Sequence, residues 1–321
     1  MQACLSTCFY YTEYPTEDKM SFRSKFWISL IRYRHLFQGK LKPEIVDESF
    51  SVEKFRQSID RMTARGTNTI KGLSIQSTTL KGLNAEWLLP NEAPKAKVIL
   101  YIHGGGFISG SCLTHRRHVA KFALGSDLNT LLFDYRLAPE HPFPAALEDC
   151  VTAYESLLEQ GFSPSDIVLC GESAGASLTL ATLLAIRDKK LALPSKAVAI
   201  SPVTDLTCKA PSFTYNAPRD IAPQNSWTVW TQYYIGTNDP KLPHLSPLNG
   251  NLQGLPPLYL CVGSHEIHLD DTVNFAKKAS SQGVAVTLKV SPGMIHAFPL
   301  LAPLFPEATH AMKEICTFIN S

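Results

Sequence analysis

Short apolar runs alternate with amphipathic stretches along the chain from about residue 80 onward. Seven of the runs are rich in Val, Ile and Leu and have the length of strands, at 83–89, 98–102, 130–134, 167–170, 197–201, 258–262 and 284–290. Between them, helix-like segments occupy 118–124, 145–160, 176–188, 271–282 and 307–319. Strands that alternate with helices predict an α/β fold with a mostly parallel sheet flanked by helices on both faces.

Two segments do not follow this alternation, residues 1–60 and residues 205–256. The second interrupts the series of strands and is rich in proline and aromatic residues. Its Trp227, Trp230 and Tyr234 fall at i, i+3 and i+7, so a helix shows them on one face. That face either packs into a core or covers a ligand. We therefore expect one large domain, residues 61–204 and 257–321, with residues 205–256 inserted between two of its strands.

The pentapeptide Gly171-Glu172-Ser173-Ala174-Gly175 stands between a predicted strand and a predicted helix. A turn this sharp strains the central residue and requires glycine two positions away on each side, where a Cβ would collide. Ser173 is thereby presented outward. The N–H groups at the start of the following helix, beginning with that of Ala174, point to the same place and favour a developing negative charge.

A second glycine motif follows the buried run 98–102, as His103-Gly104-Gly105-Gly106-Phe107. Three glycines expose bare backbone and allow positive φ, so their N–H groups can approach an oxyanion closely. No phosphate-binding pattern follows them, which disfavours a nucleotide site. Gly104, Gly105, Gly106 and Ala174 are the candidate oxyanion-hole residues.

Four motifs together resemble the hormone-sensitive lipase-like α/β-hydrolases: 103–106, Tyr135-Arg136-Leu137-Ala138-Pro139-Glu140, 171–175, and Gly293-Met294-Ile295-His296-Ala297-Phe298. Their order and spacing match the family from about residue 80 to the end. The resemblance implies an α/β-hydrolase fold in which residues 1–60 and 205–256 form a helical cap. It also implies an apolar substrate pocket, for which Phe107, Tyr215, Trp227 and Trp230 are candidates, with Phe22, Phe26, Trp27 and Phe37 as further roof residues.

The candidate base and acid follow the last two predicted strands. His296 lies in the loop after the final strand, where a histidine can take the serine proton and return it to the leaving group. For the acid, the family has Asp-Pro-Leu, whereas this chain reads Glu266-Ile267-His268 before Asp270 and Asp271. Glu266 lies nearer the strand end; Asp270 is the alternative, although it can also cap the next helix. Arg136 and Glu140 are candidates for an ion pair under the site.

The predicted reaction is hydrolysis of short- to medium-chain carboxylic esters by Ser173, His296 and Glu266 through an acyl-enzyme. A lactone or amide hydrolase would use the same residues, and some members of the family are receptors without the catalytic histidine, which this chain retains. No cofactor is expected. The sequence His265-Glu266-Ile267-His268 lacks the H-E-x-x-H spacing of zinc enzymes, so no metal is expected either.

The composition is that of a globular enzyme, with 321 residues, 45% of them hydrophobic, and a formal net charge of +2. This charge gives no reason to expect nucleic-acid binding. Six of the eight cysteines are scattered, which predicts free thiols and a reducing, cytoplasmic location. Only Cys4 and Cys8 are close together, and this pair alone is weak evidence for a metal site. The N-terminus lacks the features of a signal peptide, and no run is long enough for stable membrane insertion. The expected partner is a small-molecule ester, with a homodimer as the possible assembly.

Overall fold

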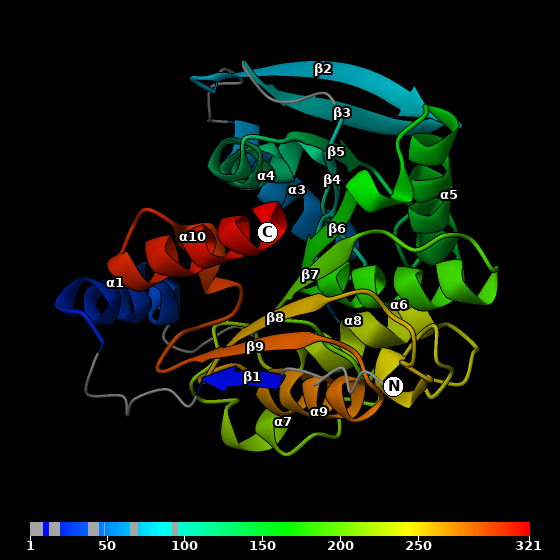
Figure 1. Ribbon diagram of the computed structural model, residues 1–321. Coiled ribbons are helices and arrows are strands. Elements are labelled where there is room, and N and C mark those ends of the chain that lie inside the picture. The colour runs from blue at the N-terminus through cyan, green and yellow to red at the C-terminus, as the bar shows by residue number, and fades with distance from the viewer. Residues whose placement is uncertain (1–8, 13–19, 38–44, 48, 65–69, 92–95) are drawn as a thin grey trace.

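A twisted nine-stranded sheet forms the centre of the described protein (Figure 1). The computed structural model describes residues 9–12, 20–37, 45–47, 49–64, 70–91 and 96–321. In spatial order the strands are β1 (Phe9–Thr12), β9 (Val286–Ser291), β8 (Leu258–Gly263), β7 (Lys196–Ile200), β6 (Ile167–Glu172), β4 (Val98–Ile102), β5 (Asn129–Phe133), β3 (Leu83–Pro90) and β2 (Leu73–Leu80). The pairs β2–β3 and β3–β5 are antiparallel and the other pairs parallel, so the predicted α/β-hydrolase fold is confirmed.

The central strands are apolar throughout because both faces of the sheet are covered. Along β4, Val98, Leu100 and Ile102 belong to the core on one face, and Ile99 and Tyr101 belong to the core on the other. The first core includes α5 (Ala145–Glu159), α6 (Ala174–Asp188) and α9 (Leu269–Ser281). The second includes α4 (Cys112–Ser126) and α10 (Pro306–Asn320), with α1 (Phe22–Arg32) packed beside α10.

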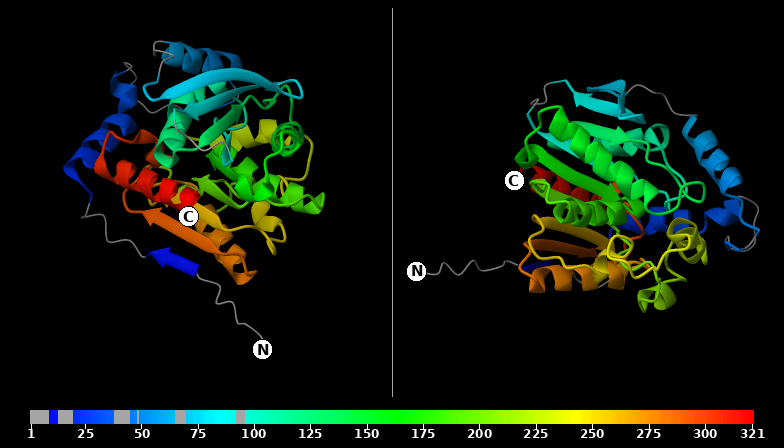
Figure 2. Two further views of the ribbon diagram at one scale, coloured as in Figure 1. Left: turned by 45° about the horizontal axis from the view of Figure 1, so that its top comes forward. Right: turned by 90° about the vertical axis from the view of Figure 1, so that its right-hand side faces the viewer.

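The remaining helices lie beyond the carboxyl ends of the parallel strands or close to them. They are α2 (Arg34–Phe37), α3 (Val52–Ala64), α7 (Ser212–Tyr215) and α8 (Ser226–Ile235), and the 3₁₀ turns are Pro164–Asp166, Pro247–Asn249 and Phe298–Leu301. Figure 2 shows α3 and the α7–α8 region on the same side of the molecule. Loops at this edge of a parallel sheet carry the ligand site in folds of this kind.

Two strands were not expected from the sequence pattern. The first is β2, which forms a hairpin with β3 at the sheet edge; its end residues Leu73 and Leu80 are buried, and the residues between them are exposed or partly buried. The second is β1, which pairs with β9 at the opposite edge. Residues 9–12 therefore extend the sheet, although they fall in the segment 1–60 expected to form cap. The other domain boundaries stay predictions.

Among the residues that the structure describes, no helix has both the length and the apolar character needed to cross a membrane. The cysteines of this part of the chain, Cys112, Cys150, Cys170, Cys208, Cys261 and Cys316, are free thiols, and all except Cys208 are buried. Cys4 and Cys8 lie outside the described residues.

Candidate active site

Ser173 forms the whole connection between β6 and α6. Its backbone has φ 58° and ψ −127°, a conformation that a side-chain-bearing residue rarely adopts. The flanking glycines make room for this turn. A Cβ on Gly171 would lie 2.4 Å from the carbonyl oxygen of Gly175, and a Cβ on Gly175 would lie 2.1 Å from that of Ile102. The structure thus contains the strained strand-turn-helix connection that the pentapeptide predicts.

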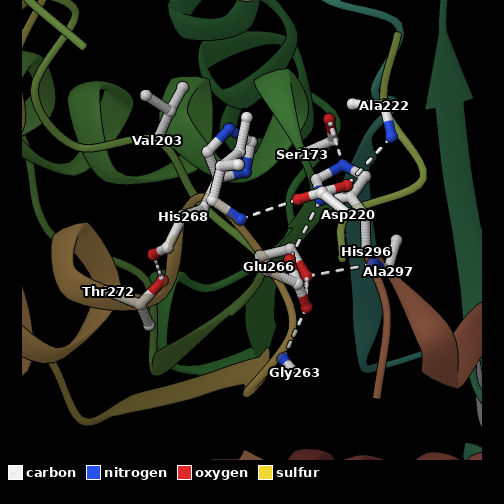
Figure 3. A network of polar contacts seen from close by, with 12 residues as sticks. Ser173, Val203, Asp220, Ala222, Gly263, Glu266, His268, Thr272, His296 and Ala297 are labelled. Carbon is white, nitrogen blue, oxygen red and sulfur yellow. Dashed lines mark hydrogen bonds and ion pairs between the residues drawn. The ribbon is translucent and has the colours of Figure 1, made fainter. Parts of the chain in front are cut away.

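Ser173, His296 and Glu266 are joined by two hydrogen bonds (Figure 3). Ser173 Oγ lies 2.9 Å from His296 Nε2, and His296 Nδ1 lies 3.0 Å from Glu266 Oε2. A carboxylate only accepts, so Nδ1 carries the proton toward Glu266, which leaves Nε2 as the acceptor for the Ser173 hydroxyl. The three side chains come from the ends of β6, β8 and β9, and the structure brings together all three residues expected from the sequence.

Glu266 is fully buried and its carboxylate is surrounded by donors. Ser201 Oγ donates to Oε1 at 2.9 Å, and the Gly263 N–H donates to the same oxygen. Burial raises the pKa of Glu266, and the bond from His296 opposes that rise. Burial also lowers the pKa of His296, but the hydrogen bond and charge of Glu266 outweigh it, so this pKa is raised above its ordinary value. The pair therefore favours a positive charge on the imidazole.

Asp270, the alternative acid, serves a different contact. Its carboxylate accepts hydrogen bonds from the Ser212 N–H at 2.8 Å and from the Tyr215 hydroxyl at 2.9 Å. It lies in the first turn of α9, which begins at Leu269, so the expectation that it precedes the helix and caps it is wrong. Asp270 ties α7 to α9, and His296 bonds to Glu266 instead.

The glycine loop after β4 lies beside Ser173, but its three amides differ. The Gly104 N–H donates to Glu172 Oε1 at 2.7 Å. Because this amide already has an acceptor, the prediction that Gly104 donates to the oxyanion is wrong. Among the described residues, the N–H groups of Gly105, Gly106 and Ala174 have no hydrogen-bond acceptor. Gly105 and Gly106 have φ of 118° and 64°, which glycine adopts without strain.

Glu172 and His103 hold the glycine loop in place. Burial raises the pKa of Glu172 to about 7, although the Gly104 N–H favours its charged form. His103 is also buried; its Nδ1 donates to the carbonyl of Gly104 at 2.8 Å, and its ring stacks on Tyr135 with centroids 4.2 Å apart. Burial lowers the pKa of His103 to about 4. His103 is therefore a neutral residue that supports the loop.

A cavity of about 450 Å³ opens over Ser173 and His296. Of the four pocket candidates, Trp227 and Trp230 line it. Phe107 does not, because it is buried against Tyr234 with stacked rings 4.2 Å apart. Tyr215 does not either, since its hydroxyl binds Asp270 and its side chain is half exposed. Two of the four candidate pocket residues therefore line the cavity, and two do not.

The cavity wall includes residues that the sequence pattern does not predict. Phe55 and Ile59 of α3 face the cavity, and Phe55 packs on Trp230 with ring centroids 5.4 Å apart. The roof expected from Phe22, Phe26, Trp27 and Phe37 does not form, and those residues do not line the cavity. Phe55 and Ile59 are four residues apart, which predicts that they share one face of a helix. This spacing does not indicate which surface that face contacts.

His268 adds an unexpected second imidazole. It is fully buried, with its ring centroid 5.0 Å from that of His296 and 4.3 Å from that of Trp227. Burial and the neighbouring His296 lower its pKa well below the ordinary range. Glu266, His268 and His296 place potential ligand atoms within 4.8 Å of one another. The hydrogen bonds of Glu266 and His296 already explain two of these three side chains, and the absence of a metal stays a prediction.

The chain is similar to known proteins over most of its length. The sequence model of a family with the α/β hydrolase fold matches residues 99–300. An acetyl-hydrolase of Streptomyces hygroscopicus is 38% identical over 244 residues, which are 76% of this chain and 81% of that protein. An esterase of Acinetobacter venetianus is 36% identical over 252 residues, covering 78% of this chain and 82% of the esterase.

Solved structures show the same likeness over nearly the whole length. The crystal structure of EstE5, soaked with p-nitrophenyl butyrate, has a TM-score of 0.85 and 35% identity, covering 94% of this chain and 98% of its own. An esterase from the bacterial hormone-sensitive lipase family has a TM-score of 0.85 and 34% identity, with the same coverage. Fold, motifs and relatives together establish that the chain belongs to the α/β hydrolase family, among its hormone-sensitive lipase-like members.

Proposed function

We propose that the protein is a serine carboxylesterase that hydrolyses short- to medium-chain carboxylic esters through an acyl-enzyme. The observation that carries this proposal is the continuous pair of hydrogen bonds from Ser173 through His296 to Glu266 at the floor of a cavity. Relatives over most of the chain are an acetyl-hydrolase and an esterase, which supports carboxylic esters as the substrate class.

In the first step Ser173 Oγ attacks the ester carbonyl while His296 Nε2 takes its proton. The positive imidazole is stabilised by Glu266, whose effect on the His296 pKa has the required direction. The carbonyl oxygen becomes an oxyanion, and the free N–H groups of Gly105, Gly106 and Ala174 are its donors. The tetrahedral intermediate then collapses, the C–O bond to the alcohol breaks, and His296 returns the proton to the departing oxygen.

In the second step a water replaces the alcohol. His296 takes a proton from this water as it attacks the acyl carbon, and the same amides hold the second oxyanion. The carboxylic acid leaves when the bond to Ser173 Oγ breaks and His296 returns the proton to the serine. Every proton and electron pair is thus accounted for by the ester, water and these side chains.

The cavity favours an uncharged acyl or alcohol group of limited size. Its roof consists of the aromatic side chains Phe55, Trp227 and Trp230 together with Ile59. Of its histidine side chains, His118 has a pKa lowered to about 4, chiefly by burial, and is neutral in the physiological range. A volume of about 450 Å³ is small for a long acyl chain together with its alcohol.

We further place the enzyme in a reducing compartment, the cytoplasm. The six described cysteines are free, and burial raises the pKa of the Cys150 and Cys170 thiols, which disfavours their oxidation. Alkylation of the denatured protein, purified from its native host without reductant, tests this placement. Full alkylation of the thiols supports it, and blocked thiols contradict it.

Hydrolysis of p-nitrophenyl esters from acetate to palmitate tests the proposed reaction. Ser173→Ala should lower kcat by about 10⁴-fold or more with an unchanged circular dichroism spectrum. Glu266→Gln should also be impaired, whereas Asp270→Asn is the matched control and should keep most of the activity. Undiminished turnover in Ser173→Ala would exclude the mechanism. Turnover of lactones or amides in preference to every ester would change the substrate class while keeping the same residues.

A further inference from the structure

Exposed apolar side chains concentrate on α1 and α2. Five of the eleven large hydrophobic side chains that are exposed in the described chain lie between residues 22 and 37: Phe22, Phe26, Tyr33, Leu36 and Phe37. Phe22 and Phe37 are 84% and 75% exposed. An outward helix face normally carries polar residues, so an aromatic one requires a separate explanation.

The aromatic residues share one side of α1 because of their spacing. Phe22 and Phe26 are four residues apart, and Tyr33, at the helix end, follows Phe22 by eleven, which is close to three full turns. The opposite side of α1 holds Ser24 and Ile28, both buried. The aromatic stripe therefore faces outward as a consequence of how the helix is seated.

The inner side of α1 is firmly attached to the catalytic domain. Ser21 donates to Glu307 of α10 through its N–H at 2.6 Å and its hydroxyl at 3.0 Å, and Ser24 Oγ donates to the same carboxylate. Figure 1 shows α1 beside α10. The helix is thus held in one orientation, and a rotation that would bury Phe22 and Phe26 would break these contacts.

Positive charge flanks the aromatic stripe. The segment 20–37 contains Arg23, Lys25, Arg32 and Arg34 and no acidic residue. On the helix, Arg23 lies to one side of the stripe and Lys25 lies to the other, following from a rotation of about 100° per residue. Arg32 is partly buried, and its Nη2 contacts His265 Nδ1 at 3.2 Å. Arg23 and Lys25 are exposed and pair with no carboxylate in the part of the chain that the structure describes.

The same segment lies next to two residues that line the catalytic cavity. Arg34 Nη2 donates to the carbonyl of Ile221 at 2.8 Å. Ile221 and Ala222 line both the catalytic cavity and a groove that they form with Tyr33, Arg34 and His35. A surface that binds the outer face of α1 and α2 would therefore lie near the catalytic cavity.

We propose that the outer face of α1 and α2 docks the enzyme reversibly on an anionic lipid surface. Aromatic side chains enter the headgroup region of a bilayer, and flanking lysine and arginine side chains are attracted to anionic lipids. The combination of both features and the lack of acidic residues fits such a surface better than an uncharged apolar partner. Docking of this kind is peripheral and needs no helix that spans the bilayer.

Vesicle sedimentation of the full chain tests the proposal and does not depend on turnover. Wild-type protein should sediment with phosphatidylcholine vesicles containing about one third phosphatidylglycerol, and far less with phosphatidylcholine alone. Arg23→Glu/Lys25→Glu should weaken this binding by at least about 10-fold, and Phe22→Ser/Phe26→Ser by a similar factor. Thermal unfolding shows that each variant is folded.

Matched controls carry the same changes at exposed positions outside α1 and α2. These are Lys241→Glu/Lys277→Glu and Leu124→Ser/Leu242→Ser, which should bind as the wild type does. Equal loss in the controls, or no binding of wild-type protein to anionic vesicles, overturns the proposal. A concentration-dependent dimer that Phe22→Ser/Phe26→Ser abolishes, without vesicle binding, would assign the face to a second copy and overturn it as well. Failure of ester hydrolysis with vesicle binding intact would contradict the proposed function alone.

Discussion

At the level of single residues, Gly106 contributes more than a flexible backbone. Its φ of 64° is unfavourable for other residues, and an added Cβ would lie 2.5 Å from Cε3 of Trp230. Trp230 in turn packs on Phe55, so Gly106 sets the separation between the glycine loop after β4 and the helices α8 and α3. A methyl group here would displace the amide that we assign to the oxyanion.

Gly106→Ala should therefore lower kcat/KM by about 10- to 100-fold, since a misplaced oxyanion donor costs a few kcal/mol of barrier. Gly161→Ala is the matched control, because Gly161 also has positive φ, 92°, but no heavy atom lies within 4 Å of its added Cβ. Gly161→Ala should lose about 1 kcal/mol of stability from backbone strain, and Gly106→Ala should lose more, because its Cβ also collides with Trp230. Ester kinetics and thermal unfolding separate the two effects, and equal kcat/KM in both variants would remove Gly106 from the site.

We expect the ionisation of His296, next to Glu266, to determine the pH dependence of hydrolysis. The base must be neutral, so kcat/KM should fall as pH drops through the His296 pKa, which Glu266 raises above its ordinary value. Glu266→Gln removes the charge responsible, so the acidic limb should move to lower pH. Turnover should fall by about 10³- to 10⁴-fold, because the tautomer is no longer fixed.

The pH profile of kcat/KM for a p-nitrophenyl ester measures this shift, with Asp270→Asn as the control that should keep the wild-type limb. An unmoved limb in Glu266→Gln would show that the carboxylate does not act on His296. A limb that moves in Asp270→Asn instead would transfer the role to Asp270.

At the level of elements, the sequence predicts the central strands well and the edges poorly. β4, β6 and β8 are buried on every residue, so their apolar runs are unambiguous. β2 is half exposed, and β1 depends on pairing with β9, which a local pattern does not reveal. The roles of Ser173 and His296 can be predicted because each lies in a short motif with a defined local structure. The roof from α3 and the contact of His268 with His296 depend on packing between distant segments.

The ion pairs also depend on contacts between distant segments, which local sequence patterns do not predict. Arg136 and Glu140 were expected to pair, but Arg136 donates to Asp149 at 2.8 Å, and Glu140 accepts from Arg56 of α3 at 2.8 Å. Residues 136 and 140 belong to one motif, whereas the actual partners come from α5 and α3. Cis bonds at Pro139 and Pro144 bracket this loop, a feature that the sequence pattern does not specify.

Arg56 fixes α3 over the cavity and gives a prediction for this element. Its guanidinium donates to the Ile108 carbonyl at 2.6 Å, the Ala138 carbonyl at 2.8 Å and the Glu140 carboxylate. Arg56→Ala should loosen the roof of Phe55 and Ile59 and lower stability by about 2 kcal/mol. KM for a butyrate ester should rise about 10-fold with little change in kcat, because the catalytic residues stay in place.

Steady-state kinetics and thermal unfolding test this role of α3, with the neighbouring exposed residue in Lys54→Ala as the control. A lower kcat at unchanged KM would show that Arg56 acts on the chemical step instead. Identical behaviour of the two variants would mean that α3 does not form the roof during turnover.

At the level of the whole molecule, a group of buried or partly buried histidines connects the glycine loop after β4 with α4. His103 stacks with His115 of α4 at 4.9 Å between centroids, and His115 Nε2 lies 3.3 Å from Glu172. Burial lowers the pKa of His103, His115 and His118, so all three are neutral in the folded state near neutral pH. Protonation of these residues therefore opposes folding, and the arrangement that supports the active site also limits its stability in acid.

His118 allows this acid sensitivity to be measured. In the unfolded chain its pKa is near the ordinary value of 6.5, and in the folded protein it is about 4. Between these values the unfolded state binds more protons, so stability falls as pH decreases from about 6.5 toward 4. In His118→Gln the free energy of unfolding should fall less over this range, by about 2 kcal/mol, since the ring is partly solvated. Glu172, whose pKa is raised to about 7, has the opposite dependence but is present in both proteins.

Urea unfolding at pH 7 and pH 4.5 gives the difference, with the exposed His310→Gln as the control. An equally steep loss in His118→Gln and wild type would show that His118 does not contribute to acid unfolding.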